Sequence, residues 1–152
     1  MEFFDTHAHI NDEQFDERRD EVIAEARAAG LVGVVAVGIS AATSRECIEL
    51  ARRYDIVFAA VGIQPNSCAE AAPGDWEAIV ELASDPLVVA LGETGLDRYW
   101  DDAPFPIQQD YFDRHLRLSQ SSGLPFVVHM RDCESDVLEM LREARRRGPL
   151  GG

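Results

Sequence analysis

Short apolar runs alternate along the chain with longer segments in which apolar residues recur at helical spacing. Most of the short runs lack the alternating polar positions of a strand that faces water on one side. They are typical of parallel β-strands that are covered on both faces. The five predicted strands, rich in Val, Ile, Phe and Ala, are residues 2–6, 32–39, 56–63, 87–92 and 125–129.

Five amphipathic segments follow these runs and predict helices. We expect the first helix to extend to about Ala29 and the fourth to end before Gly123, because glycine commonly follows a helix C-terminus. The expected start signals are, in order, Asn11 or Asp12, a capping box of Thr43 and Glu46, the turn Pro73-Gly74-Asp75, Pro106, and Cys133. The side chains expected to face inward from the last helix are Val137, Leu138, Leu141 and Ala144.

Five β-α repeats predict right-handed crossovers and a parallel sheet, which makes the fold class α/β. The repeats are about 31 residues long, so eight of them would need about 246 residues, close to the length of a TIM barrel. We therefore expect residues 1–152 to form a single, partial domain with about five of the eight units of a TIM-barrel-like fold. The alternative is a complete five-stranded open sheet, which the length alone would favour.

The composition narrows the class of protein. The formal net charge of −14 over 152 residues, with arginine as the only basic residue besides histidine, excludes a general basic surface for nucleic acid. No apolar run is long enough to cross a membrane, and no secretory leader precedes the first strand. Cys47, Cys68 and Cys133 are odd in number and far apart, so we expect reduced thiols and a cytoplasmic location.

Two histidines close the first predicted strand. His7 and His9 are two residues apart, so in an extended chain both side chains project from the same face. Two neutral imidazoles at one point suit a divalent metal ion. The alternative is a pair of ordinary surface or hydrogen-bonded histidines.

Further residues with metal-binding or catalytic chemistry follow the fourth and fifth predicted strands. Glu93 lies between two glycines, where a carboxylate can meet a cation or a reacting group, although the glycines alone would indicate only a turn. Asp97 is either a partner that orients a ligand or a solvated loop residue. His129 ends the fifth run, and Arg131 shares its face, where it would contact a substrate phosphate or a neighbouring carboxylate. His115, in the middle of a helix, is interpreted as structural or exposed.

These residues converge, because the carboxyl ends of parallel strands lie at one rim of the sheet, where α/β enzymes place their sites. Together with their flanking residues they resemble the TatD-type deoxyribonucleases, a family of metal-dependent hydrolases with an amidohydrolase-like barrel. The resemblance runs in order over nearly the whole chain. Its motifs are residues 4–9 (FDTHAH), 62–66 (GIQPN), 92–97 (GETGLD), 108–109 (QQ) and 124–131 (LPFVVHMR).

The resemblance implies a site and an activity. It places metal ligands at His7, His9, Glu93 and His129, with Glu93 also catalytic, and one or two divalent ions such as Mg, Mn or Zn. The implied reaction is hydrolysis of DNA phosphodiesters, from strand ends, in the intact form of the enzyme. Gln64 and Asn66 stand where the family usually has histidines, and we expect them to contact substrate.

Several alternatives remain open at this stage. Family members continue for about a hundred residues beyond this length and carry a late aspartate, so the chain is either a natural short form or a truncation, and its own turnover is a separate question. An amidohydrolase acting on a small amide or ester would use the same ligands. A non-catalytic α/β fragment would associate with itself through open sheet edges.

Overall fold

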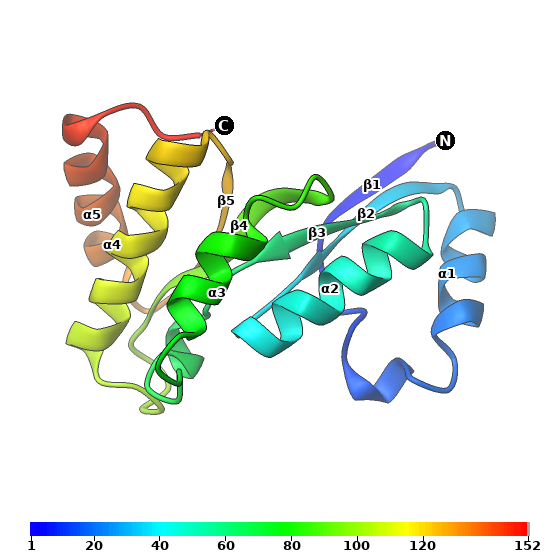
Figure 1. The fold of residues 1–152 in the computed structure, drawn as a ribbon, viewed down its shortest axis with the longest axis horizontal. Helices are drawn as coiled ribbons and strands as arrows, with labels where there is room; N and C mark the ends of the chain where they lie inside the picture. Colours follow the sequence, from blue (N-terminus) through cyan, green and yellow to red (C-terminus); the bar gives the residue numbers. More distant parts are fainter. Residues whose placement is uncertain (152) are drawn as a thin grey trace.

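The computed structural model describes residues 1–151, and its elements follow the predicted order. The strands are β1 (Phe3–Ala8), β2 (Leu31–Val37), β3 (Val57–Val61), β4 (Val88–Asp97) and β5 (Phe126–Arg131). The helices are α1 (Arg19–Ala28), α2 (Ala41–Arg53), α3 (Asp75–Leu82), α4 (Phe105–Ser122) and α5 (Glu134–Arg147), with short 3-10 helices η1 (Glu13–Phe15) and η2 (Pro65–Ser67). Figure 1 shows their arrangement.

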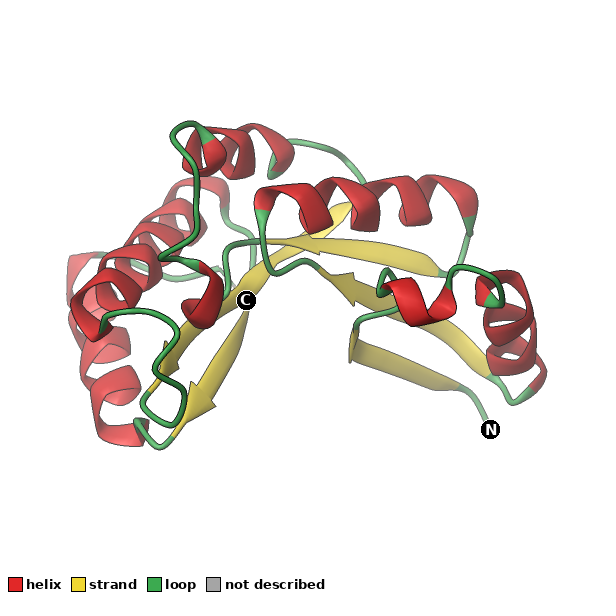
Figure 2. Ribbon diagram, turned by 90° about the horizontal axis from the view of Figure 1, so that it is seen from below, coloured by secondary structure: helices red, strands yellow, loops and turns green. Residues whose placement is uncertain are grey.

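The strands form one parallel sheet in the order β1-β2-β3-β4-β5. Each strand pairs with the next one along the chain, so the order never reverses as it does in a doubly wound sheet. The sheet is strongly curved, and the five α-helices lie on its convex side (Figure 2). These are the features of a TIM-barrel-like α/β fold, which confirms the predicted class against the open-sheet alternative.

Two-sided burial explains why the strands read as continuous apolar runs. In β2, Val34 and Ala36 belong to the main core beneath the helices, whereas Val35 and Val37 belong to a separate cluster with Ala60 and Ala90. Alternate residues thus face the helix-covered side and the concave side, and both sets are apolar. On the concave side the ring of Phe4 stacks on that of Phe58, with the centroids 5.7 Å apart, and Phe4 stays half exposed.

The prediction of one continuous first helix that starts at Asn11 or Asp12 is wrong. Asp12 caps η1 by accepting a hydrogen bond from the Gln14 amide, and α1 begins only at Arg19. The Arg19 guanidinium donates to the carbonyls of Ile10, Asn11 and Asp12, which holds the chain in a loop that a continuous helix would not allow.

The capping box of the second helix, α2, consists of other residues than the predicted pair. Ser40 is the N-cap of α2, and its side chain accepts from the Thr43 amide while the Thr43 hydroxyl accepts from the Ser40 amide. Thr43 therefore occupies the third helical position instead of the cap, and Glu46 takes no part. The starts of α3 at Asp75 and of α4 near Pro106 agree with prediction, and Gly123 ends α4 in the left-handed conformation.

The inward face of α5 is narrower than expected. Val137 and Ala144 are buried, whereas Leu138 is 47% exposed and Leu141 only half-buried. Because α5 contacts α4, β4 and β5 along a single stripe, neighbouring positions 137 and 138 cannot both face the core. Within residues 1–151, no helix combines the length and the apolar character needed to cross a membrane.

Candidate metal centre

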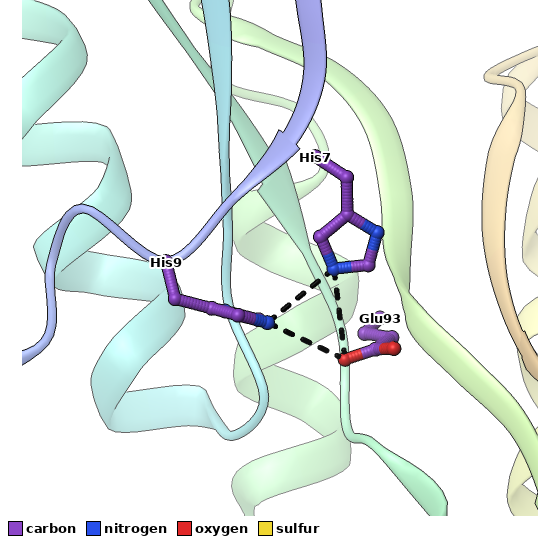
Figure 3. A group of neighbouring side chains, drawn as sticks. All are labelled: His7, His9 and Glu93. Carbon is purple, nitrogen blue, oxygen red and sulfur yellow. Dashed lines mark hydrogen bonds and ion pairs between the residues drawn. The ribbon is translucent and has the colours of Figure 1, made fainter.

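The two histidines at the end of β1 face one point. Their Nε2 atoms lie 3.3 Å apart (Figure 3), although both side chains remain partly exposed. His9 Nδ1 donates a hydrogen bond of 3.0 Å to the Val37 carbonyl at the end of β2. Because a carbonyl only accepts, the proton is on Nδ1 and the lone pair of Nε2 is directed toward His7. This is the orientation in which a histidine ligates a metal ion.

Glu93 approaches the histidines from β4. Its Oε2 atom lies 3.9 Å from His7 Nε2 and 3.8 Å from His9 Nε2, and the residue is buried (Figure 3). One donor atom from each of the three side chains lies within 4.8 Å of the other two. Two imidazole nitrogens and one carboxylate oxygen at this separation fit a divalent cation, so the donor set is suited to the ion that the sequence predicts.

The charge of Glu93 is set by opposing effects. Burial alone would raise the pKa of its carboxyl group. The hydrogen bond from His129 and its charge, followed by smaller electrostatic contributions of His7 and His9, outweigh burial, so the pKa lies below its ordinary value. Glu93 is therefore an ionised carboxylate at neutral pH, as a metal ligand must be.

His129 lies on the other side of the Glu93 carboxylate. Its Nδ1 atom is 3.1 Å from Glu93 Oε1, and its Nε2 atom is 2.8 Å from Asp97 Oδ2. These two bonds, Glu93 first, raise the pKa of His129 despite its partial burial. The structure thus brings His129 to the site through Glu93, but it is not one of the three residues with clustered donor atoms. Its role as a ligand stays a prediction.

Asp97 is a buried carboxylate with four hydrogen-bond donors. Oδ2 accepts from Asn66 Nδ2 at 3.1 Å as well as from His129, and Oδ1 accepts from the amides of Tyr99 and Trp100. Burial would raise its pKa, but the bonds from Trp100, Asn66, His129 and Tyr99 together lower it. Asp97 therefore orients His129 and the following loop, and it is not the solvated loop residue of the alternative interpretation.

A glycine permits the close approach of β4 and β5 at this point. Gly95 pairs with His129 and has φ of +138°, a conformation that other residues rarely adopt. A Cβ at this position would overlap the His129 carbonyl oxygen. The sequence places Gly95 between Glu93 and Asp97, so the glycine lets both carboxylates reach the same histidine.

The predicted substrate-binding residues occupy different places. Gln64 lines a cleft of about 1030 Å³ that also borders His9 and Glu93, and its Oε1 accepts from the Asn66 amide. The Asn66 side chain is bonded to Asp97, so in this structure it supports the site. Arg131 makes no ion pair with any residue in the described range 1–151, and its guanidinium instead lies over the Tyr99 ring.

Sequence reasoning missed two features close to the candidate site. Gln108, in α4, is buried, and it accepts a hydrogen bond from the Asp97 amide while donating to the Ala103 carbonyl. The Gln108-Gln109 pair was part of the family resemblance but was given no role. Tyr99 and Trp100, beside Asp97, are the second feature, and two adjacent aromatic residues in a polar loop were the available signal.

Comparison with known proteins identifies the family of the chain. A family model described as TatD related DNase matches residues 4–151. The "Uncharacterized metal-dependent hydrolase YabD" of Bacillus subtilis is 39% identical over 92% of this chain and 55% of its own length. The "3'-5' ssDNA/RNA exonuclease TatD" of Salmonella typhimurium is 33% identical over 91% of this chain and 53% of its own length.

A solved structure shares the fold. The TatD homologue YJJV of Escherichia coli superimposes with a TM-score of 0.88 at 27% identity, over 93% of this chain and 56% of that chain. The present chain thus spans about half the length of the curated relatives that it matches. The family model covers residues 4–151, a relative is 39% identical over 92% of the chain, and the fold matches a solved TatD homologue, so the chain belongs to the TatD related DNase family.

Proposed function

We propose that the protein is a metal-dependent hydrolase of nucleic acid phosphodiesters, and that His7, His9 and Glu93 hold its cation. The observation that carries the proposal is the convergence of these three side chains from β1 and β4. The names of the relatives, a metal-dependent hydrolase and 3'-5' exonucleases for single-stranded DNA and RNA, support the same reaction class. We extend that polarity and substrate to this family member as part of the proposal.

The two oxygens of Glu93 allow for a second ion. Oε2 faces His7 and His9, while Oε1 faces His129. His129, freed of its proton, would supply a nitrogen for a second cation on that side. The imidazole ligands suit Zn²⁺ and disfavour Mg²⁺, which prefers oxygen.

The groups around the proposed ligands fix the orientation of the histidines, and the charge of the adjacent cleft decides what can bind there. A divalent cation supplies Lewis acidity toward a phosphodiester and lowers the pKa of water near it. The Val37 carbonyl fixes the His9 tautomer, and Asp97 fixes the His129 ring. The cleft beside the site has six acidic side chains, Asp12, Glu13, Asp16, Glu46, Glu49 and Glu93, against two arginines, Arg19 and Arg45. A phosphate therefore needs the cation in order to bind there.

The cysteines bear on where in the cell the protein acts. We place it in the cytoplasm, since Cys47, Cys68 and Cys133 are free, buried thiols that fit a reducing compartment.

We also propose that residues 1–152 act as one domain. Strands β1 and β5 are the two edges of the sheet, and a further chain segment or a second copy would pair with them.

The metal content of the purified protein tests the site. After incubation with Mn²⁺ or Zn²⁺ and desalting, mass spectrometry should find bound metal in the wild type and a loss of at least about tenfold in the double variant His7→Ala, Glu93→Ala. The matched control Glu139→Ala, Glu143→Ala removes two exposed carboxylates from α5 and should retain the metal. Equal metal content in all three proteins would show that His7 and Glu93 do not hold the cation.

The reaction class needs a separate assay. The intact protein, loaded with metal, should release nucleotides from the 3' end of a labelled single-stranded oligonucleotide, and the double variant should not. Turnover of a small amide or ester, without any nucleotide release, would replace the nuclease by the amidohydrolase alternative.

A further inference from the structure

An exposed aromatic pair lies just beyond the carboxyl end of β4, the strand that carries Glu93. Tyr99 and Trp100 lie two and three residues beyond Asp97, the last residue of β4, and are 53% and 50% exposed. Their ring centroids are 4.8 Å apart at an interplanar angle of 88°. Large adjacent aromatic surfaces that remain in water are more typical of recognition than of packing.

Arg131 completes this surface from the neighbouring strand. Its guanidinium carbon lies 3.8 Å from the centroid of Tyr99 and 5.5 Å from that of Trp100. Arg131 is two residues beyond His129 in β5, so both side chains project from the same face of the sheet. The aromatic pair and the arginine therefore lie at the rim that carries the proposed metal ligands.

The loop that carries the aromatic pair is held in place from two sides. Asp97 Oδ1 accepts from the amides of Tyr99 and Trp100 at 2.8 and 2.9 Å. The Arg98 amide donates to the Arg131 carbonyl, and its guanidinium makes two hydrogen bonds with Asp136, of 2.9 and 2.8 Å. A surface fixed in this way loses little conformational freedom when it binds a ligand.

The surrounding charges indicate which part of a substrate would bind. Exposed carboxylates of Asp101, Asp102 and Asp132 flank the aromatic pair and Arg131 in sequence. They disfavour a phosphate as the main contact. Aromatic rings and a planar guanidinium are the groups on which unpaired bases stack in single-stranded DNA and RNA.

We propose that Tyr99, Trp100 and Arg131 form a stacking platform for an unpaired nucleobase at the rim of the sheet that carries the proposed metal site. The platform rests on the proposed nuclease function and adds to it the side chains that would contact a base of the single strand. In duplex DNA the base faces are covered by their neighbours, so the platform binds only where the strand is unpaired.

Two fluorescein-labelled oligonucleotides of equal length and charge test the platform in EDTA, which prevents cleavage. One is oligothymidylate and the other carries abasic residues. By fluorescence anisotropy, the wild type should bind oligothymidylate at least about fivefold more tightly, the effect of stacking a single base. The ratio should fall to about one in Tyr99→Ala, Trp100→Ala and recover in Trp100→Phe. Arg131→Ala should lower the ratio, while Arg146→Ala, an exposed arginine on α5, should leave it unchanged.

The outcomes separate the platform from the nuclease proposal. A wild-type ratio near one, or no binding of either oligonucleotide, overturns the platform. A ratio that persists in Tyr99→Ala, Trp100→Ala, with the thermal melting curve unchanged, also overturns it. Because EDTA is present throughout, failure of the metal site would show in the metal content and not in this ratio.

Discussion

The histidine on the helix-covered side of the sheet and the histidines at its carboxyl end differ in what their ring nitrogens contact. His115, in α4 on the helix-covered side, is fully buried, with Nε2 accepting from the Ile63 amide and Nδ1 donating to the Tyr111 carbonyl. At the carboxyl end of the sheet, His9 donates through Nδ1 to a carbonyl but directs Nε2 at His7 and Glu93.

This difference separates a structural histidine from a candidate ligand. Both nitrogens of His115 are occupied by backbone groups, so it has no lone pair for a metal ion or substrate. Burial, opposed in part by the Tyr111 carbonyl, lowers the pKa of His115 to about 4. His7 and His9 each keep a nitrogen that no backbone group occupies, and they stay accessible. The helix context of His115 indicated a structural or an exposed residue, and its complete burial selects the structural role.

Removing the two kinds of side chain should change the stability by very different amounts. We expect His115→Ala to lower the free energy of unfolding by about 4 kcal/mol, because it leaves a cavity and an unpaired Ile63 amide. His7→Ala should change it by about 0.5 kcal/mol or less in metal-free buffer. Urea denaturation measures both. Similar losses in the two variants would contradict the distinction.

Lowering the pH should reduce the free energy of unfolding through protonation of His115. Its pKa is depressed in the folded state, so below the ordinary value near 6.5 the unfolded chain binds a proton that the folded chain refuses. The stability that His115 contributes is complete above pH 6.5 and declines to about pH 4, by about 3 kcal/mol in total. The matched variant His115→Gln keeps an acceptor for Ile63 but cannot titrate. Parallel pH profiles of the two proteins would show the assignment to be wrong.

The histidines at the carboxyl end should stabilise the fold only when a cation is present. At a free metal concentration about 100 times the Kd, binding should raise the free energy of unfolding by about 2.7 kcal/mol. The variant His7→Ala, Glu93→Ala should show no increase, whereas His115→Gln should show the full one. Thermal melts with and without Mn²⁺ measure the effect, and an equal shift in the double variant would place the cation elsewhere.

Much of the fold was predictable because two-sided burial leaves an unbroken apolar signal in each strand. The extension of β4 from Glu93 to Asp97 was not, because this segment follows Gly92 and contains Gly95 and two carboxylates. It becomes a strand only by pairing with β5, from Thr94↔Val128 to Asp97↔Arg131. Likewise, Ser40 and Thr43 are both acceptable caps in isolation, and the path of the preceding loop decides between them.

The candidate site was predictable to the level of residues but not of contacts. Parallel topology alone brings His7, His9 and Glu93 to one rim. The partners of His129 depend on which carboxylates reach it in space, and Glu93 and Asp97 both do so across Gly95. Asn66 could be recognised as polar, but its bond to Asp97 joins residues 31 positions apart.

The most direct test of the metal centre is a crystal structure of the protein grown with Mn²⁺, with an anomalous difference map collected at the manganese edge. The strongest peak should lie between His7 Nε2, His9 Nε2 and Glu93 Oε2, within ordinary coordination distance of all three atoms. A fully loaded crystal whose peak lies away from these atoms, or that shows no peak, would contradict the assignment of this centre.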